Sequence, residues 1–298
     1  LYKDSNFYFV LFDAKKNTYD FNDNIKIIDL NIEASNNILK KIYNTIKKYL
    51  KIKKIKKDLK IDISISFLRE PNFINVITRV KKEKIIISIR NKMSELDDSK
   101  IKKMLTKYAG KKADKVVALS KMVRKDQIDV YGIDENKVNV IYNACNSEKI
   151  QKLSNEKIDN GKLEKILENY NGNIVINIGR LTYQKGQKHL IRAFKEVVKK
   201  VPEAKLLILG KGELKEELEK MIKELRLENN VFLAGFYNNP YKFMKKADVF
   251  AFSSMFEGLG NILLEAMACG LPIISTDCEY GPREIIAPSS NLESHASN

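Results

Sequence analysis

The feature of this 298-residue sequence that most constrains its fold is a regular alternation of short apolar runs with longer helical patterns. The apolar runs are continuous and rich in β-branched side chains, as expected for strands buried on both faces of a sheet. In the first half these runs are Phe7–Phe12, Ile25–Leu30, Ile61–Phe67, Ile85–Ile89, Val116–Leu119 and Val138–Tyr142. Helical patterns such as Asn36–Lys57 and Lys121–Tyr131 separate them. This order predicts an α/β fold with a parallel sheet and helices on both faces.

The same alternation begins again after a polar stretch. Residues 143–172 are rich in Asn, Lys, Glu and Ser and contain Asn-Gly pairs, which is typical of a linker with a first helix. The strands predicted after it are Ile174–Ile178, Lys205–Leu209, Val231–Leu233, Val249–Phe252 and Ile273–Ser275. The helices predicted between them are Gln187–Lys200, Glu213–Leu225, Pro240–Lys246 and Gly260–Cys269. We therefore predict two Rossmann-like, doubly wound domains, residues 1–170 and 171–298.

Composition argues against several classes of protein. No run of 18 apolar residues is present, so the sequence predicts no transmembrane helix. The three cysteines, Cys145, Cys269 and Cys278, lack the spacing of a zinc site, and their odd number argues against a disulfide framework. Together these observations favour a reducing cytoplasm. With only His189 and His295, the chain is poorly supplied for a Ser-His-Asp triad or a histidine-rich metal site.

The net charge of +16 is distributed unevenly along the chain. Residues 1–150 hold 33 Lys and Arg against 19 Asp and Glu, whereas residues 151–298 hold 21 against 19. A genome rich in Lys, Ile and Asn codons would raise the charge of both halves. The asymmetry therefore favours an acidic partner for the first half, such as an anionic membrane surface or nucleic acid.

The most basic stretch is Lys47–Lys60. Its apolar positions do not form one clean stripe: Ile46, Tyr49, Leu50, Ile52 and Ile55. Two interpretations stay open, a solvated helix with one side packed on the sheet and an interfacial helix that touches anionic lipid.

Candidate binding residues in the second half follow strands, at the edge where open α/β sheets bind ligands. After Ile174–Ile178 comes a loop that begins Gly179-Arg180 and ends with Lys185 before a predicted helix. Arg180 offers a planar fork and Lys185 a point charge, so the loop is a candidate diphosphate clamp. The alternative is two solvated charges.

Two weaker signals follow the next strands. Gly210 and Gly212 would let the backbone approach a ligand closely, although a tight turn explains them equally well. Phe236 follows Gly235 after the third strand and is a candidate for holding a nucleobase, with a buried core aromatic as the alternative.

The strongest signal is a pair of glutamates, Glu257 and Glu265, on either side of a predicted helix start. At about 1.5 Å per residue the pair spans roughly 12 Å. Free backbone N–H groups between them come from Gly258, Leu259, Gly260 and Asn261. This arrangement suits a nucleoside diphosphate sugar, with the diphosphate on the helix end and hydroxyls on the carboxylates. Glu265 lies in a largely apolar segment, and a buried carboxylate requires a partner.

These residues resemble the family 4 glycosyltransferases. Glu257 to Glu265 is similar to the E-x7-E motif of that family, and Gly179-Arg180 with Lys185-Gly186 is similar to its G-R-x-x-x-x-K-G segment. The resemblance covers roughly residues 5–287. It implies a GT-B fold, in which the two Rossmann-like domains face a cleft, and a retaining hexosyltransferase that needs no metal.

By this resemblance Arg180 and Lys185 would stabilise the departing diphosphate, Glu265 would hold the ribose, and Glu257 would hold donor-sugar hydroxyls. No cofactor is implied beyond the nucleotide sugar, a UDP-sugar, as co-substrate. The segment ending Pro282-Arg283-Glu284 resembles members that transfer galactose or N-acetylamino sugars. The expected acceptor is a polysaccharide or lipid-linked glycan, met in the cytoplasm at the inner membrane face.

The sequence also departs from the family pattern. No Gly-rich loop precedes Tyr8, the chain stops after the segment ending Glu284, and Asn143 is followed by Ala144 instead of Pro. We therefore expect a chain truncated at both ends. An inactive fragment that only binds nucleotide sugar or anionic membrane stays open as the alternative. Nucleic-acid binding is not expected, because no helix-turn-helix, zinc or RNA-recognition signature is present.

Overall fold

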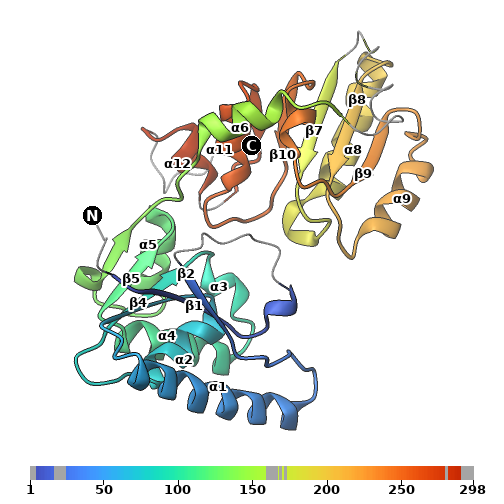
Figure 1. Ribbon diagram of the computed structural model, residues 1–298. Coiled ribbons are helices and arrows are strands. Elements are labelled where there is room, and N and C mark those ends of the chain that lie inside the picture. The colour runs from blue at the N-terminus through green and yellow to red at the C-terminus, as the bar shows by residue number, and fades with distance from the viewer. Residues whose placement is uncertain are drawn as a thin grey trace. The chain divides into compact units, whose positions relative to one another are not determined.

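The computed structural model describes residues 5–16, 25–158, 167, 170, 173–278 and 281–289. The chain forms two compact units (Figure 1). The first comprises residues 1–89, 97–117 and 131–139, and the second comprises residues 90–96, 118–130 and 140–298. Segments of the two units alternate along the chain, so the predicted division at residue 170 stays a prediction.

The first unit is built on two small sheets. One pairs β1 (Phe7–Leu11) with β2 (Ile25–Asp29) in parallel, and η1 (Ala14–Lys16) follows β1. The other has the order β3 (Ile63–Phe67), β4 (Lys84–Ile89), β5 (Lys115–Ala118) and β6 (Val138–Val140). Its helices are α1 (Ile38–Asp58), α2 (Arg69–Ile77) and α4 (Lys100–Lys112), with η2 (Glu135–Lys137) before β6. The core consists of fully buried apolar side chains from α2, β4 and β5, namely Ile74, Ile85, Ile87 and Val116.

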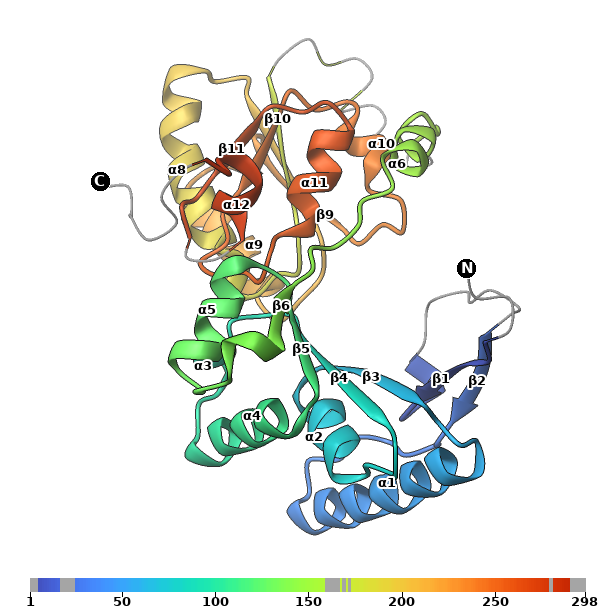
Figure 2. The ribbon, with the colours of Figure 1, turned by 90° about the vertical axis from the view of Figure 1, so that its left-hand side faces the viewer.

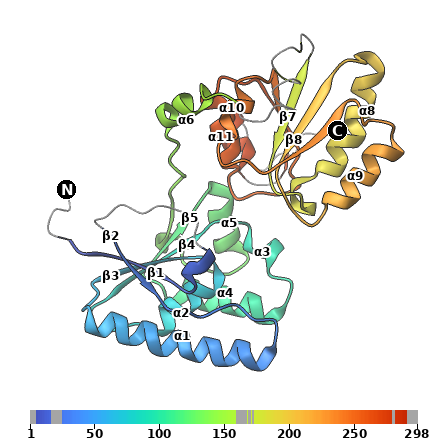
Figure 3. The ribbon, with the colours of Figure 1, turned by 45° about the vertical axis from the view of Figure 1, so that its right-hand side comes forward.

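Helix α1 runs along the outside of the first unit (Figure 3). It begins after Asn37, whose side chain accepts a hydrogen bond from the backbone N–H of Lys40 at 3.1 Å. Among the described residues, neither α1 nor any other helix is long and apolar enough to cross a membrane.

The second unit contains one parallel sheet of five strands. They are β7 (Ile174–Ile178), β8 (Lys205–Leu209), β9 (Val231–Gly235), β10 (Val249–Phe252) and β11 (Ile273–Ser275). The helices and helical turns are α3 (Met93–Leu96), α5 (Lys121–Asp129), α6 (Ser147–Ser154), η3 (Tyr183–Lys185), α8 (Gln187–Lys200), α9 (Lys215–Glu224), α10 (Tyr241–Met244), α11 (Asn261–Ala268) and α12 (Pro282–Ile286). Helix α6 packs against α10 and α11 in this unit.

Side-chain alternation in β8 explains why helices cover both faces of this sheet. Leu206 and Ile208 point to a core shared with α8 and α9, whereas Leu207 and Leu209 point to a core shared with α10 and α11. Figure 2 shows α8 and α11 on opposite sides of the strands. A strand with apolar residues on both faces must be buried on both, as the sequence predicts.

The strand order of the second unit is β11-β10-β7-β8-β9. The chain therefore moves outward from β7 through β8 to β9, and then returns to the other side of β7 to place β10 and β11. The helices that follow β7 and β10, α8 and α11, consequently lie on opposite faces of the sheet. In open α/β sheets, this reversal point at the carboxyl ends of the strands is where ligands bind.

Candidate functional site

An ion pair lies at the reversal point of the second sheet. Lys185, in the loop after β7, places its Nζ 2.5 Å from Oε1 of Glu257, in the loop after β10. The Glu257 side chain is 9% exposed and also accepts a hydrogen bond from the Ser254 hydroxyl at 2.8 Å. An ammonium group has three N–H donors, so Lys185 can bind Glu257 and still donate to a ligand.

The two loops are fastened to each other along their length. The backbone N–H of Met255 donates to the Gln184 carbonyl at 2.8 Å, and the Gln184 side chain donates to the Phe256 carbonyl at 3.0 Å. The Ser253 hydroxyl donates to the Lys185 carbonyl at 2.8 Å. These contacts fix the backbone that carries both members of the ion pair, so the charged groups are held before any ligand arrives.

Arg180 lies in the same loop as Lys185. Its backbone carbonyl accepts a hydrogen bond from the Gln187 side chain at 3.1 Å, which anchors the loop to the start of α8. The residue is exposed, and its guanidinium has no partner within the described part of the chain. Arg180 can therefore offer its whole donor fork to an anion.

The predicted glycines serve the packing of loops against one another. A Cβ on Gly210 would lie 1.9 Å from the carbonyl oxygen of Gly179, and one on Gly212 would lie 2.3 Å from that of Leu181. The same loops exchange a hydrogen bond from the Leu181 N–H to the Lys211 carbonyl at 3.1 Å. Close approach of backbone is thus the reason for these glycines, but the approaching backbone is the chain's own.

Phe236 is not a core residue, because it is 59% exposed. The Nζ of Lys211 lies 5.0 Å from the centroid of its ring, within the range of a cation–π contact. An exposed ring at the carboxyl end of β9 remains available for stacking on a base.

The start of α11 offers backbone donors. Gly260 lies at the N-cap with a φ of 84°, and the helix begins at Asn261. Leu259 is buried, so only its backbone can reach a ligand. A Cβ on Gly258 would lie 2.0 Å from the carbonyl oxygen of Arg90, which leaves room for no other residue type here.

Glu265 lines a pocket of about 230 Å³. Its carboxylate is hydrogen-bonded to the Tyr241 hydroxyl. Burial raises the pKa of Glu265 above its ordinary value, while the Tyr241 hydrogen bond opposes part of that rise. Burial, followed by the nearby Glu265 charge, raises the pKa of Tyr241 to about 12. A hydroxyl-rich ring such as a ribose would supply the further donors that this buried carboxylate requires.

The pocket includes Asn261 and Glu265 but not Glu257. Its lining residues are Ala144, Cys145, Asn146, Lys149, Ile150, Leu153, Tyr241, Asn261, Leu264 and Glu265. Complete small-molecule sites usually exceed roughly 300 Å³, so this pocket fits a part of a ligand, on the scale of one sugar ring. The two glutamates predicted as a pair thus lie in different surroundings.

Several residues of the site were not predicted as binding residues from the sequence. Tyr241 and Cys145 reach the pocket from α10 and from the segment before α6, with nothing local to mark them. Asn143 donates to Oδ1 of Asn261 at 2.6 Å and accepts from the Arg90 guanidinium, so it orients the start of α11. In the sequence, Asn143 was marked only as the residue followed by Ala144 where the family has Pro.

The Glu284 side chain is bonded to other parts of the chain. Its carboxylate accepts the backbone N–H groups of Lys121 and Met122 at 2.9 and 3.0 Å, and the Tyr142 hydroxyl at 2.8 Å. It therefore caps the start of α5.

No group of three or more His, Cys, Asp or Glu side chains in the described ranges is arranged to hold a metal ion. The need for a metal is thus a matter for experiment, and the expectation that none is needed stays a prediction. The three cysteines, all of them described, carry free thiols.

Two family models match the chain. One, described as Glycosyltransferase Family 4, matches residues 25–149, and the other, Glycosyl transferases group 1, matches residues 159–292. The matches leave few residues between them, at the polar stretch predicted as a linker.

Curated relatives extend over most of the chain. An uncharacterized glycosyltransferase of Methanocaldococcus jannaschii is 39% identical over 282 residues, which are 91% of this chain and 68% of the relative. The N-acetylgalactosamine-N,N'-diacetylbacillosaminyl-diphospho-undecaprenol 4-alpha-N-acetylgalactosaminyltransferase of Campylobacter jejuni is 35% identical over 247 residues, 79% of this chain and 63% of the relative. The chain thus spans about two thirds of the length of these relatives.

Among solved structures, Anabaena HepE in complex with UDP superposes with a TM-score of 0.68 at 21% identity. The superposition covers 88% of this chain and 69% of HepE. At this identity the likeness concerns the fold alone, and it confirms the predicted GT-B fold.

Proposed function

Because the chain belongs to the family 4 glycosyltransferases, we propose that it moves a hexose or N-acetylhexosamine from a nucleotide sugar to a glycan acceptor, with retention of anomeric configuration. The observation that carries this proposal is the Lys185–Glu257 pair at the reversal point of the second sheet. There a fixed cation and a fixed carboxylate stand where an open α/β sheet binds its ligand.

The proposed donor is a UDP-sugar, in line with the UDP held by the similar Anabaena structure. Arg180 and the remaining donors of Lys185 bind the diphosphate, together with the N–H groups at the start of α11. Glu265 accepts the ribose hydroxyls in its pocket, Phe236 faces the base, and Glu257 accepts hydroxyls of the transferred sugar.

In the proposed reaction, the bond from the anomeric carbon to the diphosphate oxygen breaks while a bond to the acceptor oxygen forms on the same face. The proton of the acceptor hydroxyl passes to the departing phosphate oxygen. Arg180 and Lys185 stabilise the negative charge that develops on the diphosphate, which is preorganised electrostatic catalysis. No protein side chain is required as a general base in this scheme.

The Campylobacter relative is named for a diphospho-undecaprenol-linked acceptor. We extend that chemistry to this chain and propose a lipid-linked or polysaccharide acceptor, without fixing its sugars.

The test is a transfer assay of the 298-residue chain with a panel of UDP-sugars and lipid-linked glycans. Arg180→Ala should weaken UDP binding by about 1.5–3 kcal/mol, the range of a charged hydrogen bond. Arg192→Ala, an exposed arginine on α8, is the matched control and should bind UDP as the unsubstituted chain does. Equal effects of the two substitutions would refute the diphosphate clamp.

The alternative is nucleotide-sugar binding without turnover. The alternative would be established if the chain binds a UDP-sugar but forms no product with any acceptor. A longer homologue, assayed under the same conditions, must form product as the positive control.

A further inference from the structure

The pocket beside Glu265 has two walls. One is the start of α6 with the residues just before it, and the other is formed by α10 and α11. Two amide oxygens of the lining are already bonded within the protein. Oδ1 of Asn146 accepts from the backbone N–H of Lys149 at 2.9 Å. Oδ1 of Asn261 accepts from Asn143 at 2.6 Å. The acceptor left for the hydroxyl groups of a ligand is therefore chiefly the Glu265 carboxylate.

Tyr241 is held in this lining by contacts outside the pocket. It is the first residue of α10, and its backbone N–H donates to Oδ1 of Asn239 at 3.1 Å. The Asn239 side chain in turn donates to the carbonyl of Leu153, near the end of α6, at 2.8 Å. The buried Lys242 donates to the Lys157 carbonyl at 2.9 Å. These contacts join the start of α10 to the end of α6 and the residues after it, so the backbone that carries Tyr241 is fixed without help from Glu265.

The Tyr241 hydroxyl donates to the Glu265 carboxylate. A glutamate has several rotatable side-chain bonds, and a hydrogen bond from a fixed donor selects one orientation among those that the side chain can adopt. An ionised carboxylate offers about four acceptor positions, of which this bond uses one. The remaining positions can accept two neighbouring hydroxyl groups of one sugar ring. The Tyr241 oxygen, having donated its proton, can accept from one of them as well.

We propose that Tyr241 is a positioning residue for ribose recognition, and that its bond to Glu265 makes the site prefer ribonucleotides to deoxyribonucleotides. The inference rests on the proposed function in taking this pocket as the ribose subsite. The phenol holds the carboxylate toward the ribose hydroxyls before the nucleotide arrives, so binding does not have to order that side chain. A deoxyribose would leave part of the buried carboxylate without a donor, which is costly for a desolvated anion.

The same bond keeps the carboxylate ionised. Burial raises the pKa of Glu265, and the hydrogen bond from Tyr241 opposes part of that rise. A protonated carboxyl group would lose acceptor positions for the ribose hydroxyls. Loss of the phenol should therefore weaken nucleotide binding more in acid than in base.

The groups around Glu265 leave it as the one that reports on this effect. The titratable side chains near it, from α11 itself and from α6 and α10 packed on α11, are Tyr241, Cys145, Lys149, Cys269 and Lys245. In α12, Arg283 is paired with Asp277 and Glu284 caps α5, and β11 carries no titratable side chain. Burial raises the pKa of both thiols, that of Cys269 to about 11, and raises the pKa of Tyr241 to about 12. Among the carboxyl, thiol and phenol groups of this cluster, the carboxyl is therefore the one whose charge changes between about pH 5 and 8.

The test is calorimetric titration of the 298-residue chain and of its Tyr241→Phe variant with UDP, at about pH 8.5 and about pH 5.5. The substitution keeps the ring and removes the hydroxyl. It should weaken binding about fivefold at the higher pH and about twentyfold or more at the lower one, where the carboxylate also protonates. The ionisation of UDP itself cancels in the ratio of the two affinities. Tyr237→Phe is the matched control, because Tyr237 packs on Phe243 and lies outside the pocket lining, and it should leave the affinity unchanged.

The choice of ligand supplies a second control. With 2′,3′-dideoxy-UDP, which lacks both ribose hydroxyls, Tyr241→Phe should change the affinity by less than about twofold. In a Glu265→Ala chain the same substitution should likewise cost less than about twofold in UDP affinity. An equal loss with UDP and with the dideoxy ligand would mean that Tyr241 acts through packing, and it would overturn the proposal. A ratio of affinities that does not change with pH would overturn it too.

A measurement without ligand separates this inference from the donor site. Carbon-13 NMR titration of the glutamate carboxyl groups, with Glu265→Gln to assign the signal, should show that Tyr241→Phe raises the pKa of Glu265 further. If UDP does not bind the folded chain, the proposed function fails, and the NMR titration still decides whether Tyr241 holds the carboxylate. An unchanged titration of Glu265 in the Tyr241→Phe chain would overturn the inference even where UDP binds.

Discussion

At the scale of single residues, two side chains that were predicted to bind a ligand separately form an ion pair with each other in the structure. Lys185 and Glu257 were predicted separately, one for the diphosphate and one for the sugar, yet they form one ion pair with side chains 19% and 9% exposed. Each charge therefore positions the other, and a substitution of one must affect both binding and stability.

We predict that Lys185→Met lowers the free energy of unfolding by about 3 kcal/mol, because it leaves the Glu257 carboxylate buried without its cation. Lys185→Met combined with Glu257→Gln should recover most of that loss, since the pair is then replaced by neutral groups. Urea unfolding of the two variants measures this. If Lys185→Met alone lowers the free energy of unfolding no more than the double substitution does, the ion pair adds nothing to stability.

Glu265 illustrates a conflict between binding and stability. Burial raises its pKa, so the folded state disfavours the carboxylate that ribose binding requires. The unfolded chain ionises first as pH rises, and stability is therefore lost between the ordinary pKa of Glu and the raised one.

Glu265→Gln should consequently stabilise the chain at pH 7 and weaken UDP binding. The gain in stability should vanish at a pH below the ordinary pKa of Glu, where both states of the unsubstituted chain are protonated. Thermal unfolding across this pH range checks the prediction. A gain that persists in acid would show that the carboxylate charge is not its source.

At the scale of elements, the loops after β7 and β8 are one packed structure. We predict that Gly210→Ala lowers both stability and UDP affinity, because the new Cβ would meet the Gly179 carbonyl oxygen at 1.9 Å. Gly235→Ala is the matched control, since Gly235 also has a positive φ, 84°, but nothing within 4 Å of its Cβ position. Gly210→Ala should lower the free energy of unfolding clearly more than Gly235→Ala does. Equal losses in the two variants would mean that the positive φ alone is responsible.

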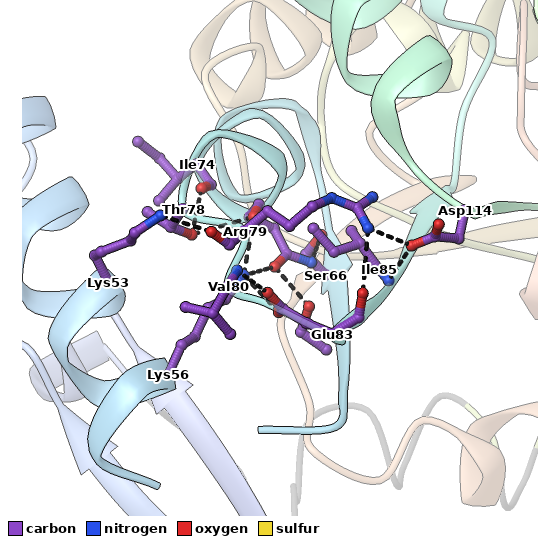
Figure 4. A network of polar contacts seen from close by, with 12 residues as sticks. Lys53, Lys56, Ser66, Ile74, Thr78, Arg79, Val80, Glu83, Ile85 and Asp114 are labelled. Atoms are coloured by element: carbon purple, nitrogen blue, oxygen red, sulfur yellow. Dashed lines mark hydrogen bonds and ion pairs between the residues drawn. The ribbon is translucent and has the colours of Figure 1, made fainter. Parts of the chain in front are cut away.

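Helix α1 depends on its inward lysines in the same direct way. Lys56→Met should cost about 3 kcal/mol, because Glu83, which is paired with Lys56 (Figure 4), would be left buried without its cation. Lys57→Met, on the exposed side of the same helix, serves as the control and should cost little. Guanidinium unfolding of both variants tests whether lysine contacts hold α1 in place.

Elements with strong periodic signals were predictable to the residue. The bounds of β7, β8, β10, β11 and α8 are those that their apolar patterns predict, because buried parallel strands are continuously apolar. The orientation of α1 was not predictable, since its lysines reach inward through contacts with distant residues such as Glu70 and Glu83. The local pattern does not say which face of the helix the fold covers.

At the scale of the whole molecule, the sequence predicted which loops follow neighbouring strands better than it predicted the contacts within those loops. Four loops predicted to converge do follow β7, β8, β9 and β10, because parallel strands end at one edge. Glu265 is hydrogen-bonded to Tyr241 of α10, and Asn261 at the start of α11 accepts a hydrogen bond from Asn143, 118 residues away in the sequence. Long-range pairs of this kind leave no periodic trace.

The charge asymmetry also belongs to this scale. The excess of cations predicts an acidic partner for the first half, which stays a prediction, and the structure places nine of the lysines on α1.

The central claim is that the second unit holds a nucleotide-sugar site, and calorimetric titration of the chain with UDP tests it most directly. The account predicts binding in the micromolar to millimolar range that Glu265→Ala weakens by at least about tenfold. Cys145, which lines the same pocket, should be protected from alkylation by UDP. No binding of UDP by a folded chain, or binding that Glu265→Ala leaves intact, would contradict the account.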